Sequence, residues 1–228
     1  MSKLLIEEKN IVVPGQELAE GMDYLPSSNV IREGDKLVAT KLGIIELSGR
    51  FVKIIPLSSA YVAKEGDLVI GKVTSIMMSG WRVDIGDSFE GVIPLKDGTT
   101  DYIQRDADLT KYFNYGDYLI TQISKVYNGR LIDLTMKGPG LRKLSAGRIL
   151  RINSSKVPRI IGKKGSMISL IKESTGAKIS VGQNGYIWLT ADDPAKELIA
   201  IKAIKLIGEE SHKSGLTDRI KDFLGSAK

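Results

Sequence analysis

The sequence contains no cysteine in its 228 residues. Disulfides, thiolate metal sites and cysteine nucleophiles are therefore excluded, and the chain suits a reducing compartment. No stretch approaches the roughly 18 consecutive apolar residues that a membrane-spanning helix needs. The first residues, MSKLLIEEKNIVVPG, combine a short apolar run with several acids, which is unlike a signal peptide. These absences predict a soluble cytoplasmic protein with no membrane partner.

Residues suited to catalysis are scarce as well. The chain has one histidine, His212, which cannot form a triad without a nucleophile and an orienting acid. Asp106 and Asp108 share the run RDADLT, but their spacing fits no calcium loop, and capping of a helix before LTKYF is the simpler interpretation. The phosphate-binding loop of NTPases and the Gly-x-Ser-x-Gly elbow are both missing from the sequence. We therefore expect no catalytic residue, no metal and no cofactor.

Charge is unevenly distributed along the chain. Residues 1–137 hold 16 Lys and Arg against 19 Asp and Glu, a net of −3, whereas residues 138–228 hold 17 against 8, a net of +9. A basic C-terminal third indicates a polyanionic partner. Lysine-rich helices that only keep the protein soluble are an equally acceptable explanation of the charge alone.

The first 137 residues predict two small β modules. In residues 1–64, KLVATKLGIIEL and RFVKIIPL alternate apolar and polar positions with a period of two, which predicts a small β domain. Residues 65–137 contain five short alternating runs, which predict a closed, five-stranded OB barrel. The predicted fold class is therefore mainly β, with an α+β module at the C-terminus.

Residues 138–147, GPGLRKLSAG, interrupt these patterns and predict a linker. Residues 148–212 then predict the order β-α-α-β-β-α, with a hairpin at Asn184-Gly185 and a long helix capped by Asp193. Residues 213–228 contain LTDRIKDFL, a C-terminal helix that either packs on this module or forms a mobile tail.

The corner between the two predicted short helices has the sequence Gly162-Lys163-Lys164-Gly165. The second helix directs its free N–H groups and positive dipole end toward this corner, and such ends bind anions. The glycines permit close approach of a phosphodiester backbone, while the lysines supply positive charge. This arrangement clamps a single-stranded nucleic acid backbone and leaves the bases to a neighbouring groove. A corner whose lysines are merely solvated is the alternative.

We place that groove at Ile160, Ile161 and Ile168, beside the edge of the strand within residues 177–183. The predicted RNA contacts of this module are Arg159, Ile161, Gly162, Lys163, Lys164 and Gly165.

Three further candidates lie in the predicted barrel. Trp81 and Phe89 are either platforms for base stacking or members of the core. Arg82 alternates with Val83, so one of them faces outward, and we expect Arg82 to face passing RNA. The module has 8 basic and 11 acidic residues, a net of −3, which disfavours strong binding of RNA by the barrel alone.

Several stretches resemble known families. VPRIIGKKGSMISLIKESTGAKISV resembles a KH domain, and GDLVIGKVTSIMMSGWRVDIGDSFEGVIPL resembles the OB domain first named from ribosomal protein S-one. IVVPGQELAEG and VKIIPLSSAYVAKEGDLVIGKV resemble the ribosomal RNA-processing protein four family, the RNA-binding cap subunits of archaeal exosomes. GQNGYIW, at 182–188, resembles the Gly-x-Asn-Gly motif of cap proteins, and we interpret it as a family marker without a contact of its own.

The resemblance implies a non-catalytic subunit that recruits single-stranded RNA and steers it into a hexameric ring of RNase-PH-like exoribonuclease subunits. Three such caps sit on each ring, held by their N-terminal domains. The chain departs from the family at Arg82, where an aromatic residue is usual, and at Pro94, where histidine is usual.

Two alternatives are a stand-alone OB-plus-KH factor in transcription or translation and a fragment of a polynucleotide phosphorylase. The antitermination type of such factors has two KH domains, for which the 16 residues after His212 leave no room. The phosphorylase has its KH domain before its OB domain, the reverse of the order in this chain.

Overall fold

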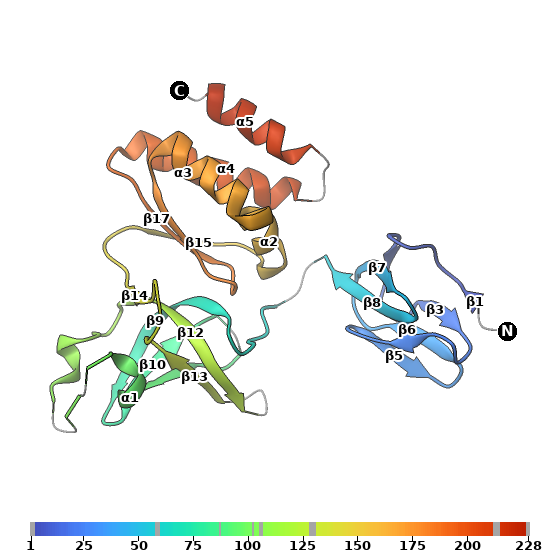
Figure 1. The fold of residues 1–228 in the computed structure, drawn as a ribbon, viewed down its shortest axis with the longest axis horizontal. Coiled ribbons are helices and arrows are strands. Elements are labelled where there is room, and N and C mark those ends of the chain that lie inside the picture. Colours follow the sequence, from blue (N-terminus) through green and yellow to red (C-terminus); the bar gives the residue numbers. More distant parts are fainter. Residues whose placement is uncertain are drawn as a thin grey trace. The chain divides into compact units, whose positions relative to one another are not determined.

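The computed structural model describes residues 3–57, 60–86, 88–101, 103–104, 107–127, 131–211 and 215–226. The chain divides into two compact units, residues 1–59 and 60–228. Figure 1 shows the second unit as a barrel joined to a helix-covered sheet.

The N-terminal unit consists of strands only, within its described residues. One sheet has the order β1-β3-β6-β5 and the other the order β2-β7-β8-β4. Alternating side chains of the two sheets form one core, which includes Leu18, Leu37 and Ile45. The strands are β1 (Lys3–Leu4), β2 (Ile11–Val12), β3 (Glu17–Glu20), β4 (Leu25–Pro26), β5 (Val30–Glu33), β6 (Lys36–Ala39), β7 (Gly43–Ser48) and β8 (Phe51–Pro56). The expected small β domain is confirmed.

The second unit begins with the barrel. Its strands are β9 (Leu68–Met77), β10 (Gly80–Asp84), β11 (Gly91–Pro94), β12 (Tyr118–Tyr127) and β13 (Leu131–Thr135), with α1 (Leu95–Gly98) and the 3-10 turn η1 (Leu109–Lys111) between β11 and β12. The order β13-β11-β10-β9-β12 closes through a further β12–β13 pairing. Closure pairs both edges of the sheet, and it confirms the predicted five-stranded OB barrel.

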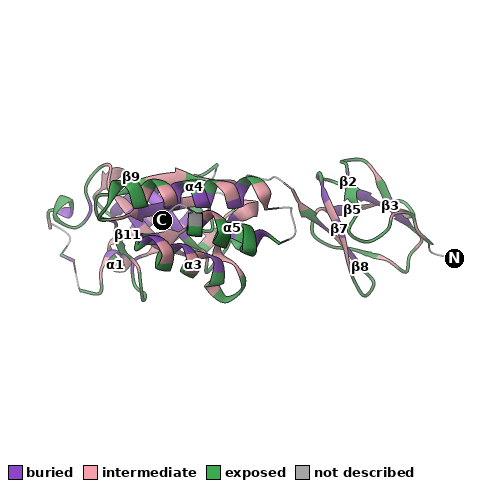
Figure 2. Ribbon diagram, turned by 90° about the horizontal axis from the view of Figure 1, so that it is seen from above, coloured by how far each residue is buried: buried purple, intermediate pink, exposed green. Residues whose placement is uncertain are grey.

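The third module has the predicted order β-α-α-β-β-α. Its elements are β15 (Arg148–Arg151), η2 (Ser154–Lys156), α2 (Val157–Ile161), η3 (Lys163–Gly165), α3 (Ser166–Thr175), β16 (Lys178–Val181), β17 (Tyr186–Thr190) and α4 (Pro194–Glu210). The antiparallel sheet β15-β17-β16 carries α2, α3 and α4 on one face, over a core that contains Ile160, Ile171 and Ile204. Buried and exposed positions are mixed along α4, because it packs against α2, α3 and α5 (Figure 2).

The C-terminal helix α5 (Leu216–Ser226) packs against α3 and α4. Its buried side chains, Leu216, Ile220 and Leu224, join the core of the module. Of the two expectations for residues 213–228, the packed helix is therefore the observed one for its described part. His212 lies outside the described residues.

The expected linker at 138–147 is more than a connection. Within it, β14 (Arg142–Lys143) pairs with β12 and extends the barrel sheet, and Leu144 is buried. Sequence reasoning missed this strand because two paired residues are too short for an alternating pattern to be visible.

The hairpin between β16 and β17 joins the barrel to the third module. Asn184 is 5% exposed, and its Nδ2 group donates hydrogen bonds of 2.7 Å to the carbonyls of Ile70 and Ile85 in the barrel. Its Oδ1 accepts from the Ile70 N–H at 3.3 Å. Beside it, the Gln183 N–H donates to the Leu68 carbonyl at 2.7 Å. We expected the Gly-x-Asn-Gly turn to be only a family marker, but its asparagine also forms this link.

Candidate nucleic-acid interface

The Gly-Lys-Lys-Gly corner forms an exposed break between two helices. α2 ends at Gly162, whose φ of 75° is in the region that favours glycine. A Cβ atom there would lie 2.7 Å from the backbone N of Met167, so a larger residue would push the corner open. Lys164 and Gly165 also have positive φ values, 54° and 81°, and α3 begins directly after them. The chain therefore turns within four residues and exposes both lysines.

The start of α3 suits an anion. Its N-cap is Gly165, which has no side chain to accept hydrogen bonds from the first turn of the helix. Lys163 and Lys164 are exposed, and no acidic side chain of the described residues lies within salt-bridge distance of either. The Ser166 N–H already donates to the Lys163 carbonyl, but the first turn of α3 has no side-chain cap. This helix start and two lysines without an acidic partner thus meet at one corner, an arrangement that favours binding of a phosphate.

A groove lies next to this corner, with a volume of about 330 Å³. Its lining residues are Ser154, Val157, Pro158, Ile161, Gly162 and Gln183. Ile161 lines it as expected, and Gln183 lies at the end of the expected strand segment, 177–183. The placement of Ile160 is wrong, because this side chain is fully buried in the core beneath the helices. Ile168 packs against the same core and does not line the groove. Arg159 is exposed one residue before Ile160.

The barrel contributes less than expected. Trp81 is fully buried, its Nε1 donates a 3.0 Å hydrogen bond to the Phe113 carbonyl, and its ring packs edge-on against the Phe113 ring. The interpretation of Trp81 as a stacking platform is therefore wrong, because the indole presents no free face. Phe89 is 41% exposed. Arg82 faces outward as expected, with its guanidinium 3.9 Å from Glu90, so part of its charge is already compensated.

Of the three candidates for catalysis, Asp108 lies within the described residues, and its role there is structural. The Asp108 carboxylate caps η1 by accepting from the N–H and hydroxyl groups of Thr110, which lowers the pKa of Asp108. Asp106 lies outside the described residues. Within the described ranges, no three His, Cys, Asp or Glu side chains gather as a metal site would require. The helices in this part of the chain are all too short or too polar to cross a membrane.

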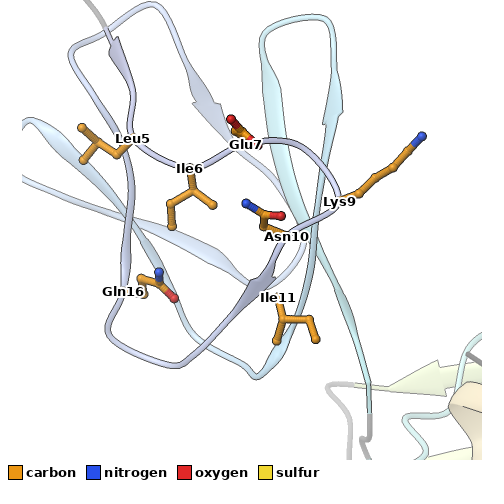
Figure 3. Close-up of a pocket in the computed structure, with 7 residues that line it drawn as sticks. All are labelled: Leu5, Ile6, Glu7, Lys9, Asn10, Ile11 and Gln16. Atoms are coloured by element: carbon orange, nitrogen blue, oxygen red, sulfur yellow. The ribbon is translucent and has the colours of Figure 1, made fainter.

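The N-terminal unit has a hollow of its own, shown in Figure 3. Its lining residues are Leu5, Ile6, Glu7, Lys9, Asn10, Ile11 and Gln16. Lys9 points away from the hollow, whereas Ile6 and Asn10 lie toward its middle (Figure 3). Its titratable lining residues are Glu7 and Lys9, and because Lys9 points away, the two do not form a pair placed for acid-base chemistry in the hollow.

An OB barrel joined to a β-α-α-β-β-α module with an open lysine corner defines a nucleic-acid-binding protein of the OB-plus-KH class. Family models support each part of this description. They match the N-terminal domain of the exosome RNA-binding protein RRP4 at residues 9–58, the RRP4 S1 domain at 60–125 and the KH domain at 148–206.

The exosome complex component Rrp4 of Pyrococcus furiosus is 39% identical over 98% of this chain and 86% of its own length. Its counterpart in Methanothermobacter thermautotrophicus is 38% identical over 97% of this chain and 70% of its own. A solved structure of a putative exosome complex RNA-binding protein is 36% identical, covers 74% of this chain and 97% of its own, and superimposes with a TM-score of 0.67. The chain belongs to the Rrp4 family of exosome complex components, which confirms the resemblance seen in the sequence.

Proposed function

We propose that this protein is a non-catalytic, RNA-binding cap subunit of a cytoplasmic exosome. The observation that carries the proposal is the open Gly162–Gly165 corner, with its uncapped helix start and two uncompensated lysines, on a chain of the Rrp4 family. Phosphates of single-stranded RNA bind at the corner, and the adjoining bases lie in the groove beside Ile161. Because the barrel has a negative net charge and Arg82 is near Glu90, the barrel guides RNA more than it holds it.

The N-terminal unit supplies the attachment to the ring. On the outer face of its second sheet, Ile11, Ile44 and Ile55 are neighbours on adjacent strands β2, β7 and β8. Ile11 is 62% exposed and Ile55 is 50% exposed, so both faces of this sheet carry apolar residues. A contiguous exposed apolar row of this kind is typical of a protein-protein contact. We assign it to the hexameric ring of RNase-PH-like subunits, with three copies of this chain on each ring.

Salt-dependent RNA binding tests the corner. Replacing Lys163 and Lys164 by Ala should weaken binding by a similar factor for RNAs of different sequence, because phosphate contacts carry no base information. The slope of log K against log salt should fall by about 1.4, since each phosphate contact to a single strand contributes roughly 0.7. A matched control is replacement of two exposed lysines of α4, Lys202 and Lys205, which removes the same charge. Equal slopes for both variants would contradict the corner as the RNA site.

Co-purification with RNase-PH-like subunits tests the attachment. Ile55→Asp should abolish the complex because it places a charge within the apolar row. Ile31→Asp is the matched control: Ile31 is 45% exposed on β5, which belongs to the other sheet of the unit. Failure of the unmodified chain to bind the ring would favour the stand-alone RNA-binding factor. RNA decay by the pure chain, in phosphate and magnesium, would contradict the non-catalytic role.

A further inference from the structure

Three basic side chains each lie over an aromatic ring where the barrel meets the KH module. Lys72 lies 6.0 Å from the centre of the Tyr118 ring. Arg142 lies 6.0 Å from the Trp188 ring, and Arg151 lies 5.5 Å from the Tyr186 ring. All three cations are exposed, and we call them the seam cations.

The three rings belong to one apolar cluster, which is built around Ile70, Leu144 and Trp188. Strand pairing explains why the cations gather there. Lys72 on β9 is opposite Tyr118 on β12, and Arg142 on β14 is opposite Ile120 on β12. The seam cations therefore surround a single cluster shared by barrel strands β9, β12 and β14 and KH strands β15 and β17.

The seam cations differ from neighbouring basic residues in their partners. Lys143, Arg148 and Arg219 form ion pairs with Asp117, Glu197 and Glu210, respectively. Among the described residues, no acidic side chain lies within salt-bridge distance of a seam cation. The nearest acid by strand pairing is Asp84, opposite Lys72, and its Oδ1 accepts a hydrogen bond from the Gly86 N–H.

A cation stacked on a ring keeps its charge. The ring restrains the side chain, while the edge N–H groups of a guanidinium remain free for a phosphate. The seam thus combines three positive charges that, within the described residues, have no salt-bridge partner, although Asp84 is opposite Lys72 on the neighbouring strand. Trp188 is only 4% exposed, Tyr118 and Tyr186 are half-buried, and a cation lies over each of the three rings, which favours phosphate contact over base stacking at the seam.

We propose that the seam cations form a second phosphate-binding site for single-stranded RNA, separate from the Gly162–Gly165 corner. Trp188 and Tyr186 belong to the seam cluster, whereas the intervening Ile187 belongs to the core beneath the helices. The seam is therefore on the sheet face opposite the helices. The corner, in contrast, lies between helices α2 and α3. A strand several times longer than the roughly four nucleotides held by a KH corner contacts both sites, whereas a five-nucleotide RNA fills the corner alone. This inference rests on the proposed RNA-binding function.

Fluorescence anisotropy with two oligoadenylates, of five and twenty nucleotides, tests the seam. The triple substitution Lys72→Gln, Arg142→Gln and Arg151→Gln should reduce the salt slope for the longer RNA by about 2, from roughly 0.7 for each of three contacts. It should leave binding of the five-nucleotide RNA unchanged. The matched control is the triple substitution Lys143→Gln, Arg148→Gln and Arg219→Gln. It removes the same number of positive charges, but from side chains that already form ion pairs. The salt slope of this variant should stay near that of the unmodified chain.

Exchange of lysine and arginine at the three positions keeps the charge and should retain the original slope, which separates charge from packing. Equal slopes for the seam and control triples would overturn the inference, as would equal weakening of the short and long RNAs by the seam triple. If the Lys163 and Lys164 variant still weakens binding in those cases, the proposed function stands without the seam. If the unmodified chain binds neither RNA, the proposed function itself fails.

Discussion

Asn184→Ala removes three hydrogen bonds between the barrel and the KH module, and its cost follows from the structure. The substitution deletes two 2.7 Å hydrogen bonds to the carbonyls of Ile70 and Ile85 and one of 3.3 Å from the Ile70 N–H. Each bond contributes about 1 kcal/mol net, and a buried carbonyl left without a donor costs more. Because Asn184 is 5% exposed, water replaces these bonds poorly. We expect the free energy of unfolding to fall by about 3 kcal/mol.

Tryptophan fluorescence is a suitable assay. The chain has two tryptophans, Trp81 and Trp188, and both lie in the second unit, so their emission reports on that unit. In a unit of this size, each kcal/mol lost from the free energy of unfolding lowers the melting temperature by roughly 2–4 °C. Asn184→Ala should therefore lower the melting temperature by about 6–12 °C.

The matched control is Gln183→Ala. Gln183 is exposed, and truncation of its side chain removes one 3.0 Å hydrogen bond, which its Oε1 accepts from the Leu68 N–H, while its main-chain bond to the Leu68 carbonyl survives. The control should therefore lower the free energy of unfolding by less than about 1 kcal/mol. Equal melting temperatures for Asn184→Ala and the unmodified protein would refute the reasoning, because they would mean that the three bonds contribute nothing to stability.

Three further outcomes follow from individual residues. Gly165→Asp places a negative charge at the phosphate site, where a side chain meets no neighbouring atom within 4 Å. It should weaken RNA binding strongly, while the φ of 81° strains the new residue and lowers stability without loss of the fold in circular dichroism; unchanged affinity would exclude the corner. Trp81→Phe should leave RNA affinity unchanged, because the ring is buried. It should lower the free energy of unfolding by about 1–2 kcal/mol, because the hydrogen bond to the Phe113 carbonyl is lost. Reduced affinity with an intact fold would restore Trp81 as an RNA contact. Asp193→Ala should destabilise α4 by about 1 kcal/mol in urea unfolding, since its carboxylate accepts from Ala195 N–H at 2.8 Å, and no change would show that the cap is dispensable.

Local sequence patterns determined most of the architecture. The period-two runs specified the strands of the barrel, and Asn184-Gly185 specified the hairpin between β16 and β17. Gly176 ends α3 with a φ of 68°, as its place after the last apolar residue indicated. The corner at Gly162–Gly165 was also visible, because glycines and lysines between two short helices leave few other conformations. Such features depend on interactions between residues close in the chain, which a sequence shows directly.

Tertiary structure decided the features that depend on distant residues. Whether Trp81 faced solvent or the core could not be read from a strand pattern, because closure of the barrel and the position of Phe113 decide it. The role of Asn184 depends on carbonyls 114 and 99 residues away. The position of the Arg142 guanidinium over the Trp188 ring likewise requires β14 and β17 to lie close together. Burial and charge compensation are properties of the assembled surface, so a single sequence names the residues involved but not their partners.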